Sequence, residues 1–140
     1  MSDTIKRVHW SFWLIAVIAL IWNGLGAINF VVQMLPGAAD AYRTSEQAII
    51  AHRPLWATTA FAVAVFGGTL GAILLLAKRQ IAFYLFVASF VGAVIAVVDP
   101  LMRGVEFGVG EIIGIVAMPI AFAAALVWYT KYAEQKGWLA

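Results

Sequence analysis

The sequence predicts an all-α membrane protein, a bundle of four transmembrane helices in up-down-up-down order. Of its 140 residues, 64% are hydrophobic and only 11% are charged. A soluble domain carries about 25% charged residues, so this composition, with a mean hydropathy of +0.96, indicates that lipid surrounds most of the chain. The apolar residues also fall into four runs, each with about the 17–25 residues that a spanning helix requires.

The four runs define the predicted helices within one integral membrane domain, residues 1–140. They cover residues 10–34, 55–77, 81–98 and 109–132. The first run is too long for a cleaved signal peptide, so we interpret it as a retained helix. The connections are short, and consecutive helices are therefore expected to be antiparallel.

Charged residues predict the orientation of the bundle. Six basic residues fall on the side of the termini: Lys6, Arg7, Lys78, Arg79, Lys131 and Lys136. Three basic and five acidic residues fall on the other side: Arg43, Arg53, Arg103, Asp40, Glu46, Asp99, Glu106 and Glu111. Because loops rich in lysine and arginine stay in the cytoplasm, both termini are expected there.

The first helix carries polar residues at a depth where lipid cannot pair them. Asn23 and Asn29 each bring amide donors and acceptors that hydrocarbon leaves unsatisfied, so we expect this helix inside the bundle with the others packed on it. A stripe at spacing i, i+4, i+7 and i+11 comprises Trp22, Gly26, Asn29 and Gln33. Two interpretations stay open: a polar groove that leads to the outer face, or the seam against the second and fourth helices.

The longest connection, residues 35–54, is expected to contain a short helix. Thr44 and Gln47 fit a capping box, which predicts a helix over residues 45–52. In the next outer connection, Asp99 and Arg103 stand at the i,i+4 spacing of a helical ion pair.

Small residues recur at helical spacing in two of the runs. The second helix has Ala60, Ala64, Gly67 and Gly71 on one face, and the fourth has Gly110, Gly114, Ala117 and Ala121. Such faces let helix backbones approach closely. We favour tight packing within one bundle for both faces, with a gating or oligomer interface as the alternative.

Several helix centres carry polar, small or helix-breaking residues near one midplane layer: Asn23, Gly67 to Thr69, Ser89 and Pro119. Transporters bind solutes at such layers, although the same side chains also form ordinary hydrogen bonds between helices. We favour the structural role and expect Pro119 to kink the fourth helix.

The residues predict no catalytic, cofactor-binding or metal site, and no cofactor. Glu111, just inside the fourth helix, is a functional candidate because it is ionisable, but a boundary acid that is solvated or paired with Arg103 explains it equally well. His9 and His52 lie at opposite ends, about a bilayer apart, and cannot share a metal or haem. There are no cysteines, and no metalloprotease, triad or phosphate-loop motif is present.

Several segments resemble a group of small bacterial inner-membrane proteins with four helices, to which the label of sugar transporter is sometimes provisionally attached. The similar segments are residues 22–24, 54–56, 66–71, 74–76, 78–79 and 136–139, whereas residues 80–83 depart from the pattern. The resemblance implies a multi-pass protein of the bacterial inner membrane and supplies no catalytic residues.

We interpret the chain as a non-catalytic integral membrane protein, an accessory or scaffold subunit that packs with a partner membrane protein or with itself. A homo-oligomer or larger complex in the lipid bilayer is expected, and no nucleic acid. The alternative is a small-solute transporter or facilitator that acts as an oligomer, motivated by the midplane layer and the stripe of the first helix. A membrane enzyme acting on lipid or prenyl substrates is the third and weakest interpretation.

Overall fold

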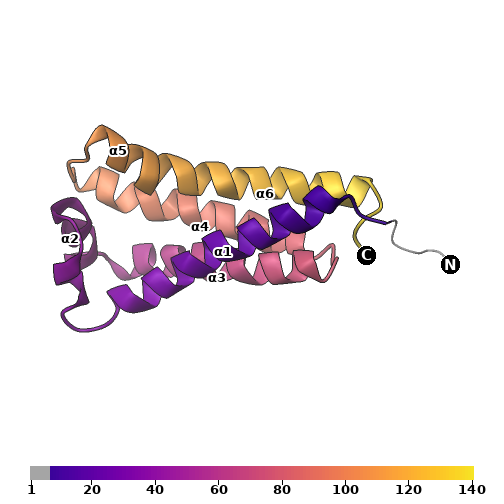
Figure 1. The fold of residues 1–140 in the computed structure, drawn as a ribbon. Helices are drawn as coiled ribbons and strands as arrows, with labels where there is room; N and C mark the ends of the chain where they lie inside the picture. The colour runs from indigo at the N-terminus through magenta and orange to yellow at the C-terminus, as the bar shows by residue number, and fades with distance from the viewer. Residues whose placement is uncertain (1–6) are drawn as a thin grey trace.

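The computed structural model is all-helical over residues 7–140, the part of the chain that the structure describes. Four helices are long and apolar enough to cross a membrane, and they run up, down, up and down along the bundle (Figure 1). They are α1 (Trp10–Gln33), α3 (Leu55–Leu76), α4 (Ala82–Met102) and a fourth span, Val109–Gln135. The predicted fold class is confirmed.

The fourth span is not a uniform α-helix. It consists of α5 (Val109–Glu111), the π-helical segment η2 (Ile112–Ala117) and α6 (Met118–Gln135). Pro119 has no backbone N–H, and its ring crowds the carbonyl group of Ile115 one turn earlier. The wider π-helical turn directly before Pro119 is where the backbone accommodates this disruption.

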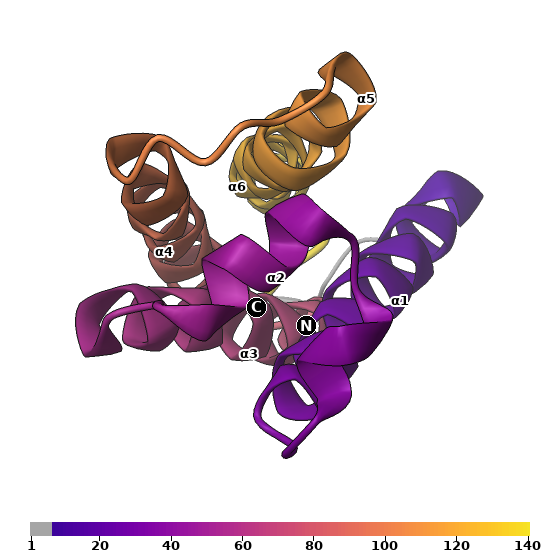
Figure 2. The ribbon, with the colours of Figure 1, turned by 90° about the vertical axis from the view of Figure 1, so that its left-hand side faces the viewer.

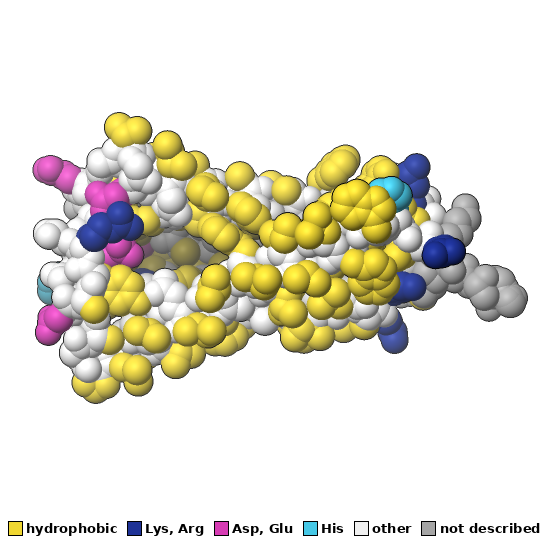
Figure 3. Space-filling view, in the orientation of Figure 1, with side chains coloured by type: hydrophobic (Ala, Val, Ile, Leu, Met, Phe, Trp, Pro, Cys, Tyr) yellow, Lys and Arg dark blue, Asp and Glu magenta, His cyan; other side chains and the backbone are white. Residues whose placement is uncertain are grey.

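The two ends of the bundle differ in structure and charge. The terminal end holds the start of α1 and the end of α6, and the loop end holds α2 (Thr44–Ala51), the short 3₁₀ helix η1 (Ala38–Ala41) and the α4–α5 connection. Acidic side chains gather at the loop end (Figure 3). Lys6 lies outside the described residues, and which end faces the cytoplasm stays a prediction.

The central helix is α3, not α1. Its most extensive contact is with α4 and its next is with α1, whereas α6 packs mainly on α4. Seen from the loop end, α1 leans away from α5 and α6 (Figure 2). The expectation that the other helices pack on the first one is therefore wrong, because the polar residues of α1 need only one protein-facing side.

Small residues bring α3 and α4 together. Ala60, Ala64 and Gly71 of α3 are buried, as predicted. On α4, a Cβ atom added to Gly92 would lie 2.7 Å from the carbonyl oxygen of Ala60. This distance shows that the two backbones are nearly in contact, which only small residues allow.

The corresponding prediction for the fourth span is wrong. Gly110, Gly114, Ala117 and Ala121 are all exposed, and a Cβ atom at either glycine would meet nothing within 4 Å. The span packs instead with another face, which includes the buried Ala123, Leu126, Thr130 and Ala133. Small-residue spacing identifies a smooth face, but tertiary packing selects which face meets the neighbour.

Apolar and aromatic side chains fill the terminal end. Phe12 and Leu75 are fully buried there, and the rings of Phe12 and Trp138 meet edge to face with centroids 6.0 Å apart. The last residues fold back beneath the α3–α4 turn, where the N–H of Ala140 donates to the carbonyl oxygen of Lys78 at 2.8 Å. The closed terminal end contrasts with a hollow at the loop end.

Candidate functional site

A cavity of about 490 Å³ lies between the helices in the loop-end half of the bundle. All four spans contribute to its walls, and α2 contributes Glu46, Ile49 and Ile50. In the space-filling view the surface is hollowed at this end, between α1 and the fourth span (Figure 3). The volume falls within the range of about 300–1,000 Å³ that is typical of small-molecule sites.

The whole stripe of α1 faces this cavity. Trp22, Gly26, Asn29 and Gln33 all line it, as the groove interpretation of the sequence predicts. Gly26 is also part of the seam with α3, because a Cβ atom there would lie 2.9 Å from the Cγ1 atom of Val65. The two interpretations of the stripe therefore apply to neighbouring parts of one helix face.

The midplane layer forms the floor of the cavity. A smaller hollow of about 50 Å³ lies there, lined by Asn23, Ser89 and Pro119 among others. The Asn23 side chain donates to the carbonyl oxygen of Ala19 at 2.9 Å, and the Ser89 hydroxyl donates across helices to that of Ala64 at 2.6 Å. Gly68 is required here, because a Cβ atom would overlap the Asn23 side-chain oxygen.

Two residues that were assigned to this layer do not line either hollow. Thr69 donates to the carbonyl oxygen of Val65 in its own helix at 2.6 Å. Gly67 faces α4, with its Cβ position 3.5 Å from the carbonyl oxygen of Leu85. Within this layer, Thr69 and Gly67 therefore contribute to helix packing, whereas Asn23 forms part of the cavity floor.

Arg53 is the most distinctive polar residue of the cavity. One terminal nitrogen donates to the Oε1 atom of Gln33 at 2.6 Å, and the guanidinium lies 5.1 Å from the centre of the Phe61 ring. Its Nε atom is buried and has no hydrogen-bond partner among the described residues. Buried donors are nearly always paired in native proteins, so the contacts within the chain leave the hydrogen bonding of Arg53 incomplete.

The charge of Arg53 is also unbalanced. Burial lowers the pKa of its guanidinium, although an arginine side chain keeps its proton in proteins. The other cation of the lining, Arg43, is paired with Glu46 at 2.8 Å. No carboxylate in residues 7–140 forms an ion pair with Arg53, so the cavity offers one positive charge to a ligand.

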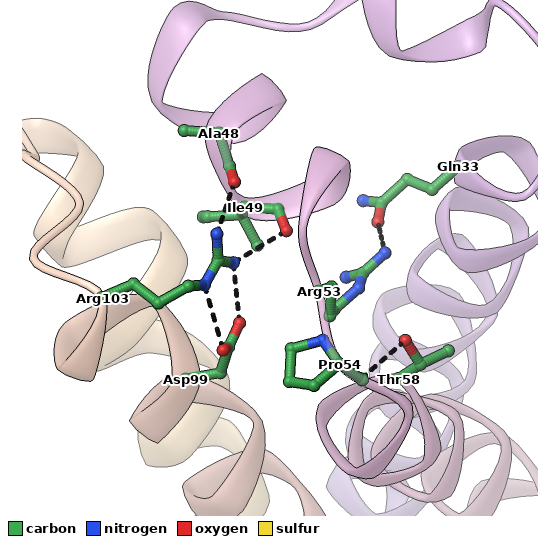
Figure 4. A network of polar contacts seen from close by, with 8 residues as sticks. All are labelled: Gln33, Ala48, Ile49, Arg53, Pro54, Thr58, Asp99 and Arg103. Atoms are coloured by element: carbon green, nitrogen blue, oxygen red, sulfur yellow. Dashed lines mark hydrogen bonds and ion pairs between the residues drawn. The ribbon is translucent and has the colours of Figure 1, made fainter.

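The helix α2 covers the loop end of the cavity and is held by Arg103. The Arg103 guanidinium donates to the carbonyl oxygens of Ala48 at 2.8 Å and Ile49 at 2.9 Å (Figure 4). The same group forms the predicted ion pair with Asp99, 2.7 Å between Nη2 and Oδ2, and Asp99 is itself buried. Asp99 thus orients the arginine that satisfies the last carbonyl groups of α2.

Two further hydrogen bonds attach the same region to other spans. The Ser45 hydroxyl donates to the carboxylate of Glu111, which also accepts the backbone N–H of Gly108 at 3.0 Å. The Tyr42 hydroxyl donates to the side-chain oxygen of Asn29. Arg103 is paired with Asp99 and not with Glu111. The contacts of Glu111 show that it positions α2.

The short helix was predicted correctly, but its capping box was not. No side chain caps the N-terminus of α2, and the Gln47 amide donates instead to the carbonyl oxygen of Tyr42 at 2.8 Å. Gln47 thus ties α2 to the preceding turn. The sequence pattern identified the helix through the wrong contact.

The cavity is open at the side, between α1 and η2. Trp22 and Phe122 stack with ring centres 4.3 Å apart and close the two spans near the midplane. Beyond this pair, toward the loop end, Gly114 is exposed and lines the cavity with nothing within 4 Å of its Cβ position. Apolar side chains border most of this opening, and basic and acidic side chains stand at its loop-end edge (Figure 3).

Sequence reasoning missed Arg53 as a site residue. The available signal was its place directly before Pro54, at the start of a spanning helix and on the same side of the membrane as Gln33. Within residues 7–140, no group of three or more His, Asp or Glu side chains could hold a metal ion. Comparisons with protein-family models, curated proteins and solved structures find no match.

Proposed function

We propose that the protein binds a small anionic molecule in its loop-end cavity, as the binding step of a transporter or facilitator. The observation that carries this proposal is Arg53, a charged guanidinium at the cavity wall that forms no ion pair with a carboxylate of residues 7–140. Arginine binds phosphate and carboxylate groups through charge-assisted and often bidentate hydrogen bonds.

The position of the cavity supports the same function. Transporters hold solutes between discontinuous helices near the middle of the bilayer, and here the floor contains Asn23 and the π-helical segment η2 borders one wall. The predicted orientation places the cavity on the outer side of the membrane. Release at the other side requires a second conformation, because apolar side chains fill the terminal end.

The interpretation as an accessory subunit stays a prediction. It requires a stoichiometric partner polypeptide, whereas a binding protein requires a retained small molecule. Both properties are measurable in one experiment.

Native mass spectrometry of the protein in lipid nanodiscs tests the proposal, with Arg53→Gln and the control Arg79→Gln. Arg79 is an exposed arginine at the terminal end. The wild type is expected to retain an anionic small molecule. Arg53→Gln should retain about a tenth of that amount or less, because a hydrogen bond to a charged group contributes about 1.5–3 kcal/mol. Arg79→Gln should behave as the wild type.

Equal retention by wild type and Arg53→Gln would contradict the proposal, as would a wild type without any bound molecule. A stoichiometric second polypeptide in place of a small molecule would support the accessory subunit.

A further inference from the structure

We propose that the ligand is a membrane amphiphile, with a phosphate or carboxylate headgroup beside Arg53 and an apolar chain that leaves the cavity between α1 and η2. This inference rests on the proposed function and names its ligand class. It follows from which sides of the cavity are closed, which side is open, and where the polar groups of the lining lie.

The loop end of the cavity is covered by a tethered segment. Ser45 connects α2 to α5 through Glu111, and Arg103 connects the last turn of α2 to α4. Tyr42, just before α2, is bonded to Asn29 of α1. Because these contacts reach three different spans, a water-soluble ligand that entered along the bundle axis would have to break several of them.

The lateral side has no such closure. Trp22 and Phe122 are stacked near the midplane, but between Gly114 and α1 the wall is open, and both line the same cavity. In a bilayer this face of the bundle meets acyl chains, since spanning helices are surrounded by hydrocarbon. A lipid can therefore enter sideways without any displacement of α2.

The lining is divided in a way that suits an amphiphile. Arg53, Gln33 and the Arg43–Glu46 ion pair lie toward the loop end, at the ends of the spans, where lipid headgroups are expected. The remaining wall, including Val65, Val97 and Ile115, is mostly apolar and extends toward the midplane and the opening, with Asn29 and Asn23 as its polar members. A free anion would satisfy Arg53 but would leave this apolar surface without a partner, whereas an attached chain covers it.

The test uses native mass spectrometry in phosphatidylcholine nanodiscs that contain a small fraction of phosphatidic acid or of diacylglycerol with the same acyl chains. This pair of probes differs only in the phosphate group. Inorganic phosphate at millimolar concentration serves as the water-soluble probe. We expect wild type to retain phosphatidic acid in preference to diacylglycerol, and this preference to disappear in Arg53→Gln.

Gly114→Phe blocks the opening, and Gly110→Phe is its matched control. Both glycines are exposed on the fourth span with nothing within 4 Å of the Cβ position, but only Gly114 lines the cavity. Both variants should therefore fold, which their thermal midpoints check, and Gly114→Ala provides a smaller substitution at the same site. Gly114→Phe is expected to retain several-fold less phosphatidic acid than wild type, whereas Gly110→Phe and Gly114→Ala should retain as much as wild type.

One outcome would overturn the amphiphile but leave the proposed anion site in place. In it, inorganic phosphate binds in a way that depends on Arg53, and Gly114→Phe retains as much phosphatidic acid as wild type. Both the amphiphile and the anion site would be overturned if phosphatidic acid and diacylglycerol were retained equally, if Arg53→Gln did not change this retention, and if inorganic phosphate did not bind. A loss of phosphatidic acid in Gly110→Phe as large as in Gly114→Phe would overturn the lateral opening.

Discussion

The close contact between α3 and α4 makes a quantitative prediction for Gly92→Ala. The added Cβ atom would lie 2.7 Å from the Ala60 carbonyl oxygen and 3.0 Å from the Ala64 backbone nitrogen. Both atoms belong to a helical backbone and cannot rotate away. To reach the 3.4 Å of ordinary contact, the two helices must separate locally by about 0.7 Å, and a gap of about 0.5–1 Å loses a quarter to a half of the dispersion energy of each contact.

The expected loss of stability follows from two opposing effects. Overpacking of a well-packed interface costs about 1–3 kcal/mol, and the replacement of a helical glycine by alanine returns about 0.5–1 kcal/mol. The net loss should be on the order of 1 kcal/mol, and at most about 2.5 kcal/mol. The separation would also stretch the Ser89 hydrogen bond to Ala64, now 2.6 Å, because Ser89 is one turn before Gly92.

Reversible unfolding in bicelles measures this effect, with Gly24→Ala as the control. A Cβ atom at Gly24 would meet nothing within 4 Å, so this variant should be as stable as wild type or slightly more stable. If Gly92→Ala and Gly24→Ala had the same free energy of unfolding, the close approach of α3 and α4 would be refuted.

Two further predictions concern the polar contacts. Ser89→Ala removes a hydrogen bond between helices and should lower the free energy of unfolding by about 0.6 kcal/mol, and at most ~1.7 kcal/mol. Thr69→Ala removes a hydrogen bond within one helix and should lower the free energy of unfolding by less in the same assay. Arg103→Lys keeps the charge but loses the planar fork that holds Asp99 and the carbonyl groups of Ala48 and Ile49, so hydrogen exchange of α2 should accelerate. Arg43→Lys alters an ion pair with Glu46 whose arginine side chain is exposed, and equal exchange rates in the two variants would contradict a tethering role for Arg103.

The candidate site could be predicted only in part. The α1 stripe from Trp22 to Gln33 was visible because helical periodicity places its members on one side, and these residues do line the cavity. Arg53 could not be assigned, because its partners Gln33 and Phe61 belong to different helices. A boundary Glu111 that is solvated or paired with Arg103 was one of the two interpretations from the sequence, whereas its actual partner is Ser45, 66 residues away.

By itself, the sequence determined the four spans, their alternating directions and the short helix before α3. These properties depend on local hydrophobicity and chain length, since a bilayer requires continuous apolar helices whatever their neighbours are. Only the tertiary structure decided that α3 is central, that Gly110 and Gly114 stay outside the packed core, and that α1 separates from η2 to leave a cavity. Inside lipid, the face that meets protein can be as apolar as the face that meets lipid, so hydrophobic periodicity alone does not distinguish the two.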